Sequence, residues 1–278
     1  MNVRFSLKTT LICTFLAAGM VKAAVWQWDR HLQKQALIQH LDTTLRMPVV
    51  PLVELLKQAP DFHNEVWRRV SFAGTYDFAR EVIVRRNRGS NDRAGFHVIT
   101  PLKLDGTDSY VLVDRGFIPL GRETLETRKQ YQQPERTQGF GLIKSSMPRK
   151  LFAPNDPPAG LNKPWVDLWI RVDIEQMKQQ LPYSVLPIYL ETMQDPNDPL
   201  VTSKIVKEGT AGKNDVLALT GQKNVENFGM DSPDVQYPVP LFDTTPPPDI
   251  HLGYVFEWSF MALLTLGIGV VLQLKRNR

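Results

Sequence analysis

Two apolar stretches at opposite ends of the 278-residue chain constrain its fold more than any other feature. The C-terminal stretch, Leu252 to Leu274, contains 23 residues with a single charge, Glu257. At ~1.5 Å of rise per residue, a helix of this length crosses the hydrocarbon core of a bilayer. We therefore predict a transmembrane helix over residues 251–274.

The N-terminal stretch, residues 5–28, has a shorter apolar centre. Lys8 and Lys22 flank that centre, where long cationic side chains reach the two membrane surfaces. Trp26 and Trp28 follow at the level of the headgroups, which indole rings favour. These features predict a second transmembrane helix.

The same N-terminal stretch is also compatible with a cleaved signal peptide. Arg4 and Lys8 resemble the basic region of such a peptide, and Val21-Lys22-Ala23 fits a small-residue cleavage site. The residues alone therefore leave two interpretations open, a retained helix and a removed leader.

Positive charge predicts the orientation of the C-terminal helix. The tail, residues 275–278, carries three basic residues, whereas no Lys or Arg occurs between Lys223 and Lys275. Basic flanks stay in the cytoplasm, so the tail is expected there. If both helices span, residues 1–4 are also cytoplasmic and residues 29–250 form a periplasmic domain. No mitochondrial presequence precedes the first apolar stretch, which favours a bacterial inner membrane.

Most of the intervening domain has the pattern of a β protein. Residues 29–45 first continue the N-terminal helix, with apolar residues at helical spacing. Short strands are then predicted near 70–76, 81–86, 95–104, 109–119, 137–145, 165–172 and 185–192, with a short helix over 174–181 that Asp173 caps. Regular spacing of short strands predicts an antiparallel barrel or sandwich. We favour a small barrel, because Gly74, Gly95 and Gly116 would permit sharp bends.

Residues 195–250 differ from the rest of the domain. They are rich in Pro, Asp, Asn and Gly, and they lack clear periodicity. We predict a long loop with one strand at most, near Asp215–Thr220, before Pro246-Pro247-Pro248 leads into the second helix.

Charge is distributed unevenly along the domain. Residues 65–150 hold 16 Lys/Arg against 10 Asp/Glu, and residues 190–250 hold 4 against 10. This pattern fits two solvated faces, or a basic half that meets lipid headgroups or an acidic partner. We predict no nucleic-acid partner.

Several classes of chemistry lack their usual residues. The only cysteine, Cys13, lies in the first apolar stretch, so the domain has neither a disulfide nor a thiolate metal site. Gly-rich phosphate loops, GxSxG elbows and HExxH pairs are missing from the sequence. We therefore do not expect an enzyme, although an unfamiliar active site stays a third alternative.

Two motifs place cations where they have either a structural or a binding role. Arg30 and Lys34 are one helical turn apart and share a face just beyond the first apolar stretch. They would anchor the helix, or contact anionic lipid or an acidic group of a ligand. Arg115, in the run Val113-Asp114-Arg115-Gly116, would form a structural corner, pair with a buried carboxylate, or bind an anion.

Two further motifs contain histidines. His97 lies on a predicted strand, where a lone histidine is usually a satisfied core or rim residue rather than a ligand. His251, Tyr254, Val255 and Trp258 fall on one face of the second helix at 100° per residue. Neutral imidazole is a good iron or copper ligand, and aromatic neighbours suit a flat macrocycle. The alternative is an interfacial belt of His, Tyr and Trp.

Taken in order, these motifs resemble the surfeit locus protein one family, the cytochrome c oxidase assembly proteins. The resemblance covers most of the chain. It rests on Trp26-Gln27-x-x-Arg30 with Lys34, His97-Val98-Ile99-Thr100-Pro101-Leu102, Val113-Asp114-Arg115-Gly116-Phe117-Ile118-Pro119, Pro187-Ile188-Tyr189-Leu190, and His251-Leu252-x-Tyr254 with Trp258. The chain departs from the family pattern at Gln33, Phe117, Asp249, Ile250 and Val255, as a divergent member would.

The resemblance implies a function in building haem–copper terminal oxidases. It implies that both terminal helices are retained and that haem a is bound, with His251 as an axial ligand. Tyr254 and Trp258 would pack against the macrocycle, and Arg30 or Arg115, by their charge, would meet its propionates. The implied partners are the oxidase catalytic subunit, other assembly factors and membrane lipid. The alternative is a membrane scaffold for oxidase subunits that holds no cofactor.

Overall fold

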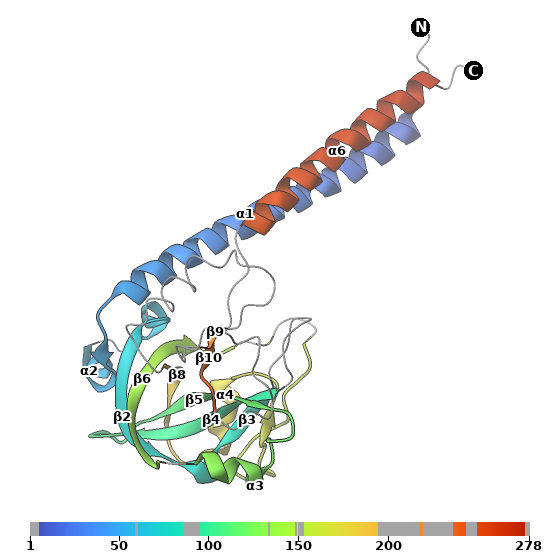
Figure 1. Cartoon of the computed structure of the whole chain (residues 1–278). Coiled ribbons are helices and arrows are strands. Elements are labelled where there is room, and N and C mark those ends of the chain that lie inside the picture. The colour runs from blue at the N-terminus through green and yellow to red at the C-terminus, as the bar shows by residue number, and fades with distance from the viewer. Residues whose placement is uncertain are drawn as a thin grey trace. The chain divides into compact units, whose positions relative to one another are not determined.

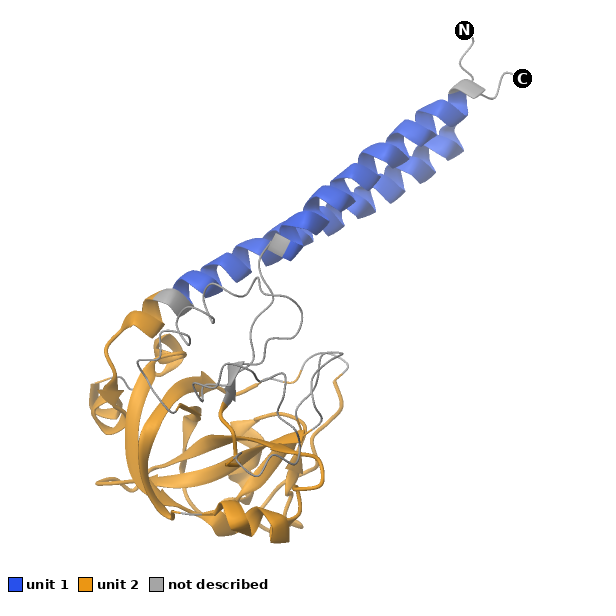
Figure 2. Cartoon of the chain, viewed as in Figure 1, with its two compact units in different colours: residues 1–40, 245–278 blue, residues 41–244 orange. Residues whose placement is uncertain are grey.

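The computed structural model describes residues 6–58, 61–85, 95–132, 134–147, 149, 153–193, 217–218, 236–242 and 249–275. The chain divides into two compact units (Figure 2). The helical unit contains residues 1–40 and 245–278, and the barrel unit contains residues 41–244. The first helix continues past residue 29, as predicted, and the boundary between the two units falls within it, after residue 40.

The helical unit is a pair of antiparallel helices. α1, Leu7–Arg46, and α6, Asp249–Lys275, lie side by side, with the start of α1 and the end of α6 at the same end of the pair (Figure 1). α1 runs without a break through both the apolar stretch and the predicted continuation over residues 29–45. Both helices are long and apolar enough to cross a membrane, over Leu7–Arg46 and Ile250–Gln273.

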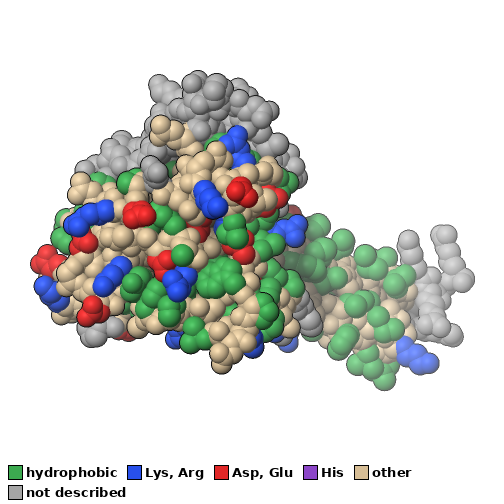
Figure 3. Space-filling view, turned by 90° about the horizontal axis from the view of Figure 1, so that it is seen from below, with side chains coloured by type: hydrophobic (Ala, Val, Ile, Leu, Met, Phe, Trp, Pro, Cys, Tyr) green, Lys and Arg blue, Asp and Glu red, His purple; other side chains and the backbone are tan. Residues whose placement is uncertain are grey.

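The surface of this helical unit is largely hydrophobic (Figure 3). Phe15 is 81% exposed, and Leu263 is 70% exposed. Apolar side chains exposed in such density along both helices indicate contact with lipid rather than water. The helices are thus consistent with membrane anchoring, as predicted.

Five strands of the barrel unit form a closed ring. They are β2 (Arg69–Tyr76), β6 (Arg136–Ser145), β8 (Val185–Met193), β5 (Tyr110–Pro119) and β4 (Gly95–Leu104). Each pairs with the next in this order, and β4 pairs back with β2 over Gly74–Tyr76 and Leu102–Leu104. Closure leaves a barrel rather than a sandwich, which confirms the favoured prediction. The β5–β8 pair is parallel, whereas the other four pairs of the ring are antiparallel.

Shorter elements extend and cover the barrel. β3 (Val82–Arg85) pairs with β4, β7 (Leu168–Trp169) pairs with β3, and β1 (Val50–Pro51) pairs with β2. The short helices are α2 (Leu52–Gln58), α3 (Leu125–Arg128) and α4 (Ile174–Met177), with 3-10 turns at His63–Glu65, Phe78–Arg80, Lys129–Tyr131 and Lys178–Gln180. β9 (Leu217–Ala218) and β10 (Leu241–Phe242) pair with each other.

Two of the hydrophobic clusters among the described residues hold most of this unit together. The first fills the barrel with inward residues of all five strands, including Phe72, Leu102 and Leu190, and α2 contributes Leu52 and Leu55. The second lies on the other face of β3, β4, β5 and β8, where α4, β7 and their flanks cover it. Trp169 of β7 is fully buried there. The strand predicted over 165–172 is therefore only two residues long, but it anchors this outer cluster.

The glycines predicted to permit bends have different functions. Gly116 has a φ of +121°, and a Cβ there would lie 2.4 Å from the backbone of Val239. Gly74 lies where β2 pairs with β4 to close the barrel. A side chain does not fit there, because a Cβ would lie 2.2 Å from the carbonyl oxygen of Lys103. Gly95 is limited in the same way by Phe117. Close strand approach, more than backbone conformation, therefore explains two of the three glycines.

Most residues of the predicted loop over 195–250 lie outside the described ones. Leu217–Ala218 falls within the strand predicted near Asp215–Thr220. Val239 forms an isolated antiparallel bridge with Phe117 of β5, with backbone N–O distances of 2.7 and 3.0 Å. Pro246-Pro247-Pro248 lies outside the described residues.

Candidate functional site

The contact face of the helical unit recurs every seven residues. On α1, Ala17, Ala24 and His31 are buried at this spacing. On α6, Ala262 and Gly269 are buried at the same spacing. Small residues let two helix backbones approach closely, and a seven-residue repeat keeps one face against the partner.

Specific contacts fix the register of the two helices. A Cβ at Gly269 would lie 2.9 Å from Cys13 Sγ, so the helices nearly touch there. Thr265 Oγ1 is 3.5 Å from Met20 Sδ, and Gln273 Nε2 donates to Thr10 Oγ1 at 3.1 Å. Later residues of α1 contact earlier residues of α6, as an antiparallel pair of helices requires.

His251 lies near the start of α6 and is joined to α1 by a hydrogen bond. Its Nδ1 is 2.8 Å from Oε1 of Gln27, 224 residues earlier in the chain. Both side chains are half-buried. Gln27 is three residues beyond the buried Ala24, so it continues the contact face toward the end of the predicted membrane span.

The aromatic residues predicted beside His251 divide between two environments. Trp258 is one seven-residue repeat beyond His251 and is half-buried, as is Val255. Tyr254 is more exposed, at 44%. The structure therefore brings His251, Val255 and Trp258 together on one face and leaves Tyr254 at its edge.

Arg30 lies in the same unit, one helical turn beyond Gln27. Its guanidinium carbon is 5.6 Å from the centroid of the Trp26 ring, and its Nη1 donates to Gln33 Oε1 at 3.2 Å. These contacts hold the cation at the helix surface while leaving it exposed to solvent or headgroups. Lys34 follows one turn later and is half-buried.

Arg115 lies in the barrel unit, in a different environment. The β4–β5 register shifts between Val98 and Ile99, and Arg115 is the extra residue of this bulge. Its Nη1 donates to Glu81 Oε2 at 3.0 Å, and its Nη2 donates to the carbonyl oxygen of Tyr131. The side chains of Arg115 and Glu81 are 9% and 1% exposed. Arg115 therefore lies at a bend in the strand and pairs with a buried carboxylate, which were two of the three alternatives for this residue.

Aromatic rings enclose the same guanidinium. The Arg115 guanidinium carbon is 5.0 Å from the Phe78 centroid and 5.2 Å from that of Tyr76. Burial raises the pKa of Tyr76 to about 12, although the Arg115 charge acts in the opposite direction. This surrounding is that of a buried structural cation rather than an open anion site.

His97 is satisfied within the barrel unit, as predicted for a lone strand histidine. Its Nδ1 is 2.7 Å from Asp114 Oδ2, and its ring meets Phe117 edge-on. Glu191 lies close by and pairs with Lys144, with 3.0 Å between Nζ and Oε2. Burial raises the pKa of Glu191, against the lowering effect of the Lys144 charge.

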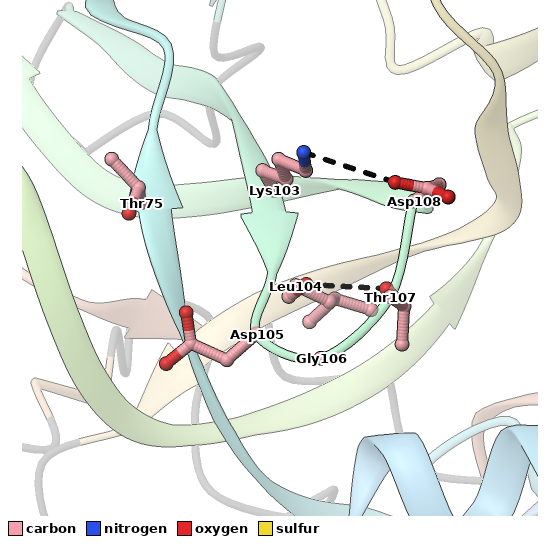
Figure 4. Close-up of a pocket in the computed structure, with 7 residues that line it drawn as sticks. All are labelled: Thr75, Lys103, Leu104, Asp105, Gly106, Thr107 and Asp108. Carbon is pink, nitrogen blue, oxygen red and sulfur yellow. Dashed lines mark hydrogen bonds and ion pairs between the residues drawn. The ribbon is translucent and has the colours of Figure 1, made fainter.

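One open pocket of about 330 Å³ lies at the β4–β5 hairpin (Figure 4). Its two carboxylates have cationic partners, since Asp108 is 3.9 Å from Lys103 and Asp105 accepts from Arg136 at 2.9 Å. None of the predicted site residues lines this pocket. Its lining residues are Thr75, Lys103, Leu104, Asp105, Gly106, Thr107 and Asp108.

One imidazole, His251, is the kind of donor that a haem would need, whereas a bare metal ion would need a larger set of ligands. Among the described residues, no three His, Cys, Asp or Glu side chains gather as a multidentate ion site would require. Haem iron needs only one or two axial donors from the protein, and neutral imidazole is a common one. His251, which shares a face of α6 with the half-buried Trp258, is one imidazole donor of this kind.

A closed barrel flanked in sequence by two apolar helices long enough to cross a membrane is consistent with a membrane-anchored barrel protein. The model of the SURF1 family matches residues 14–263, so the chain belongs to the SURF1 family. The match includes most of α1 and the first half of α6, with both partners of the His251–Gln27 hydrogen bond.

Similar curated proteins carry the same family name. Surfeit locus protein 1 of Rattus norvegicus is 26% identical over 179 residues, which cover 60% of this chain and 56% of the relative. The Homo sapiens protein of that name is 26% identical over 55% of this chain and 52% of its own length. SURF1-like protein of Monosiga brevicollis is 23% identical over 90% of this chain and 82% of its own length. The chain thus spans about half the length of the first curated relatives it matches.

Gln27 is the residue of this site that sequence reasoning overlooked. Its motif, Trp26-Gln27-x-x-Arg30, was interpreted through its cation rather than its amide. A signal was present, because an amide three residues beyond Ala24 lies on the face that also carries Ala17 and Ala24. That signal has meaning only once the partner helix is known.

Proposed function

We propose that this chain is a non-enzymatic assembly factor for a haem–copper terminal oxidase, and that it holds haem a for delivery to the catalytic subunit. The observation that carries the proposal is the placement of His251 on the contact face of the helix pair, held by a hydrogen bond at 2.8 Å. Membership of the SURF1 family supports the oxidase as client.

In this proposal each residue of the helical unit has a limited task. His251 would hold the haem through one imidazole nitrogen, and the bound group would supply an iron centre that accepts an electron pair from that nitrogen. Trp258 provides an apolar wall on the same face, and Tyr254 lies at its rim. Arg30, exposed one turn beyond Gln27, is suited to a propionate, since guanidinium pairs well with carboxylate.

Arg115 is not included in the proposed haem site. Its guanidinium already binds Glu81 and the Tyr131 carbonyl oxygen within the barrel unit. Moving it to a propionate would leave Glu81 buried without that cation, which is costly. We propose that Arg115 serves the barrel instead.

The proposal also includes the location. We propose that both helices are retained in a bacterial inner membrane, with both chain ends in the cytoplasm and the barrel in the periplasm. The antiparallel pairing of α1 and α6 supports this, because it puts the start of α1 and the end of α6 at the same end of the pair, and so on one side of a membrane that both helices cross. The partners would be the oxidase catalytic subunit, other assembly factors and membrane lipid.

Haem content of the purified full-length protein tests this function. Protein from cells that make haem a should carry haem, and His251→Ala should lose most of it. His63→Ala is the matched control, because His63 is exposed in the barrel unit, and it should retain the haem. Circular dichroism would verify that His251→Ala keeps its helices and strands.

Two results would contradict the proposal. Full retention of haem by His251→Ala would show that His251 is not the ligand. A wild-type protein without haem would favour the cofactor-free scaffold. Complementation addresses the client separately. A strain that lacks the gene should have less haem a in its oxidase, and normal oxidase content and activity in that strain would refute the assembly function.

A further inference from the structure

We infer that Gln27 is a positioning residue that fixes the tautomer of His251 and leaves its Nε2 as the ligating nitrogen. The inference about ligation rests on the proposed function. The inference about the tautomer rests on geometry alone, so the two can fail separately.

The direction of the hydrogen bond follows from the chemistry of the two atoms. An amide oxygen only accepts, so at 2.8 Å from Gln27 Oε1 the His251 Nδ1 must carry the proton. A neutral imidazole has one protonated nitrogen and one with a lone pair. The lone pair is therefore on Nε2, at the far side of the ring from α1.

The contact face gives Gln27 a restricted environment. Ala17, Ala24 and His31 define the repeating contact positions of α1, and Gln27 falls between the last two on the same face. A half-buried amide is unfavourable there unless it is paired. His251 supplies the partner, and helix–helix hydrogen bonds of this kind fix the register of membrane helices.

Both partners stand on rigid elements. Gln27 is in the interior of the 40-residue α1, and His251 is in the first turn of α6. Their bond therefore sets the orientation of the ring as well as its tautomer. Histidines that bind metals usually donate their other N–H to an acceptor, which orients the ring and raises its basicity. Gln27 is placed to perform this task for His251.

The first experiment measures the tautomer without haem. Imidazole ¹⁵N shifts of the full-length, histidine-labelled protein in detergent micelles report which nitrogen is protonated, with His251→Ala to assign the signal. The wild type should show the proton on Nδ1, and Gln27→Leu should shift the ring toward a mixture of both tautomers. Gln33→Leu, the same change at an exposed position of α1, should leave the signal unchanged.

A wild-type ring protonated on Nε2, or a Gln27→Leu signal identical to the wild type, would overturn the inference. Both outcomes are readable whether or not the protein binds haem. If the wild type binds no haem, the proposed function fails while this measurement still decides the role of Gln27.

The second experiment titrates haem a into the same variants. Gln27→Leu should weaken haem affinity by about 10- to 100-fold, the usual cost of losing such a partner. Gln27→Glu should retain haem and lower its reduction potential, because a carboxylate makes the ligand more basic. Wild-type affinity in Gln27→Leu, together with loss of haem in His251→Ala, would refute the positioning role and leave the proposed function intact.

Discussion

The two units of this protein satisfy their polar groups in opposite ways. In the barrel unit, Glu81 is 2% exposed and accepts from Thr100 at 2.9 Å, Arg115 at 3.0 Å and Gln132 at 3.4 Å. In the helical unit, the described contact that joins His251 to α1 is one hydrogen bond, between its Nδ1 and Gln27 Oε1 at 2.8 Å. A carboxylate with several donors keeps partners when one is lost, whereas His251 depends on one described partner, Gln27.

The difference follows from how each unit brings its residues together. In a sheet, pairing of neighbouring strands places many side chains within reach, so a buried carboxylate can collect several partners. Two helices in lipid meet along one narrow face, where small residues provide packing and polar pairs are few. Substitutions that break each kind of contact should therefore have different sizes and different readouts.

The largest expected effect is the loss of the Glu81 charge. Glu81→Gln keeps the shape of the side chain but leaves the buried Arg115 without its carboxylate partner. It also removes a carboxylate that lies 3.9 Å from Nε of Arg128. Breaking a buried pair in this way costs about 3–5 kcal/mol. Chemical unfolding of the full-length protein, followed by the β-sheet signal, should show this loss.

The exposed pair between Arg136 and Asp105 provides the matched control. Its side chains are 78% and 39% exposed, so Asp105→Asn, the same carboxylate-to-amide change, should cost about 1 kcal/mol or less. Equal effects for Glu81→Gln and Asp105→Asn would show that the buried network does not stabilise the barrel.

Local pattern predicted most barrel strands well. β4 spans Gly95–Leu104 as predicted, and the Asp105-Gly106-Thr107-Asp108 hairpin loop follows it. The parallel β5–β8 pair and the closure of β4 onto β2 were not predicted individually, because strand order depends on contacts between residues far apart in sequence. For the same reason, the strand predicted over 165–172 shortened to Leu168–Trp169, where it has a partner in β3.

The candidate site was predicted less completely than the fold. Helical spacing grouped His251 with Tyr254, Val255 and Trp258, and the family resemblance then singled out His251 as a ligand. It did not identify Gln27 as the partner, because periodicity defines the faces of each helix but not which residues of two faces meet. The strand pattern did not predict the bulge at Arg115. A buried carboxylate partner was one of the alternatives expected for this residue.

The next effect in size should come from forcing the two helices apart. Gly269→Val places a Cβ 2.9 Å from Cys13 Sγ, and overpacking of this kind typically costs about 1–3 kcal/mol. The rate of disulfide formation between Met20→Cys and Thr265→Cys, whose native side chains are 3.5 Å apart, reports the pairing of the helices. Mass spectrometry of the linked peptides should show a several-fold slower reaction.

Gly267→Val controls for the helix propensity of valine. Gly267 is on the same helix and has no atom within 4 Å of an added Cβ, so the disulfide should form at the unmodified rate. If Gly267→Val and Gly269→Val slow the reaction equally, the close approach at Cys13 does not control the pairing.

The smallest effect is expected from the loss of a helix cap, which is a contact between residues close in sequence. The two larger effects concern contacts between residues far apart in sequence. The Asp173 side chain accepts from the backbone nitrogen of Gln176 and so caps α4, which packs Ile174 and Met177 into the outer cluster. Asp173→Ala should cost about 1 kcal/mol, the usual value of such a cap, and Asp173→Asn should recover most of it. A loss as large as that of Glu81→Gln in the same unfolding experiment would mean that the cap also holds α4 on the barrel. The contrast between the units would then be weaker, because a contact of the barrel unit would also depend on one hydrogen bond.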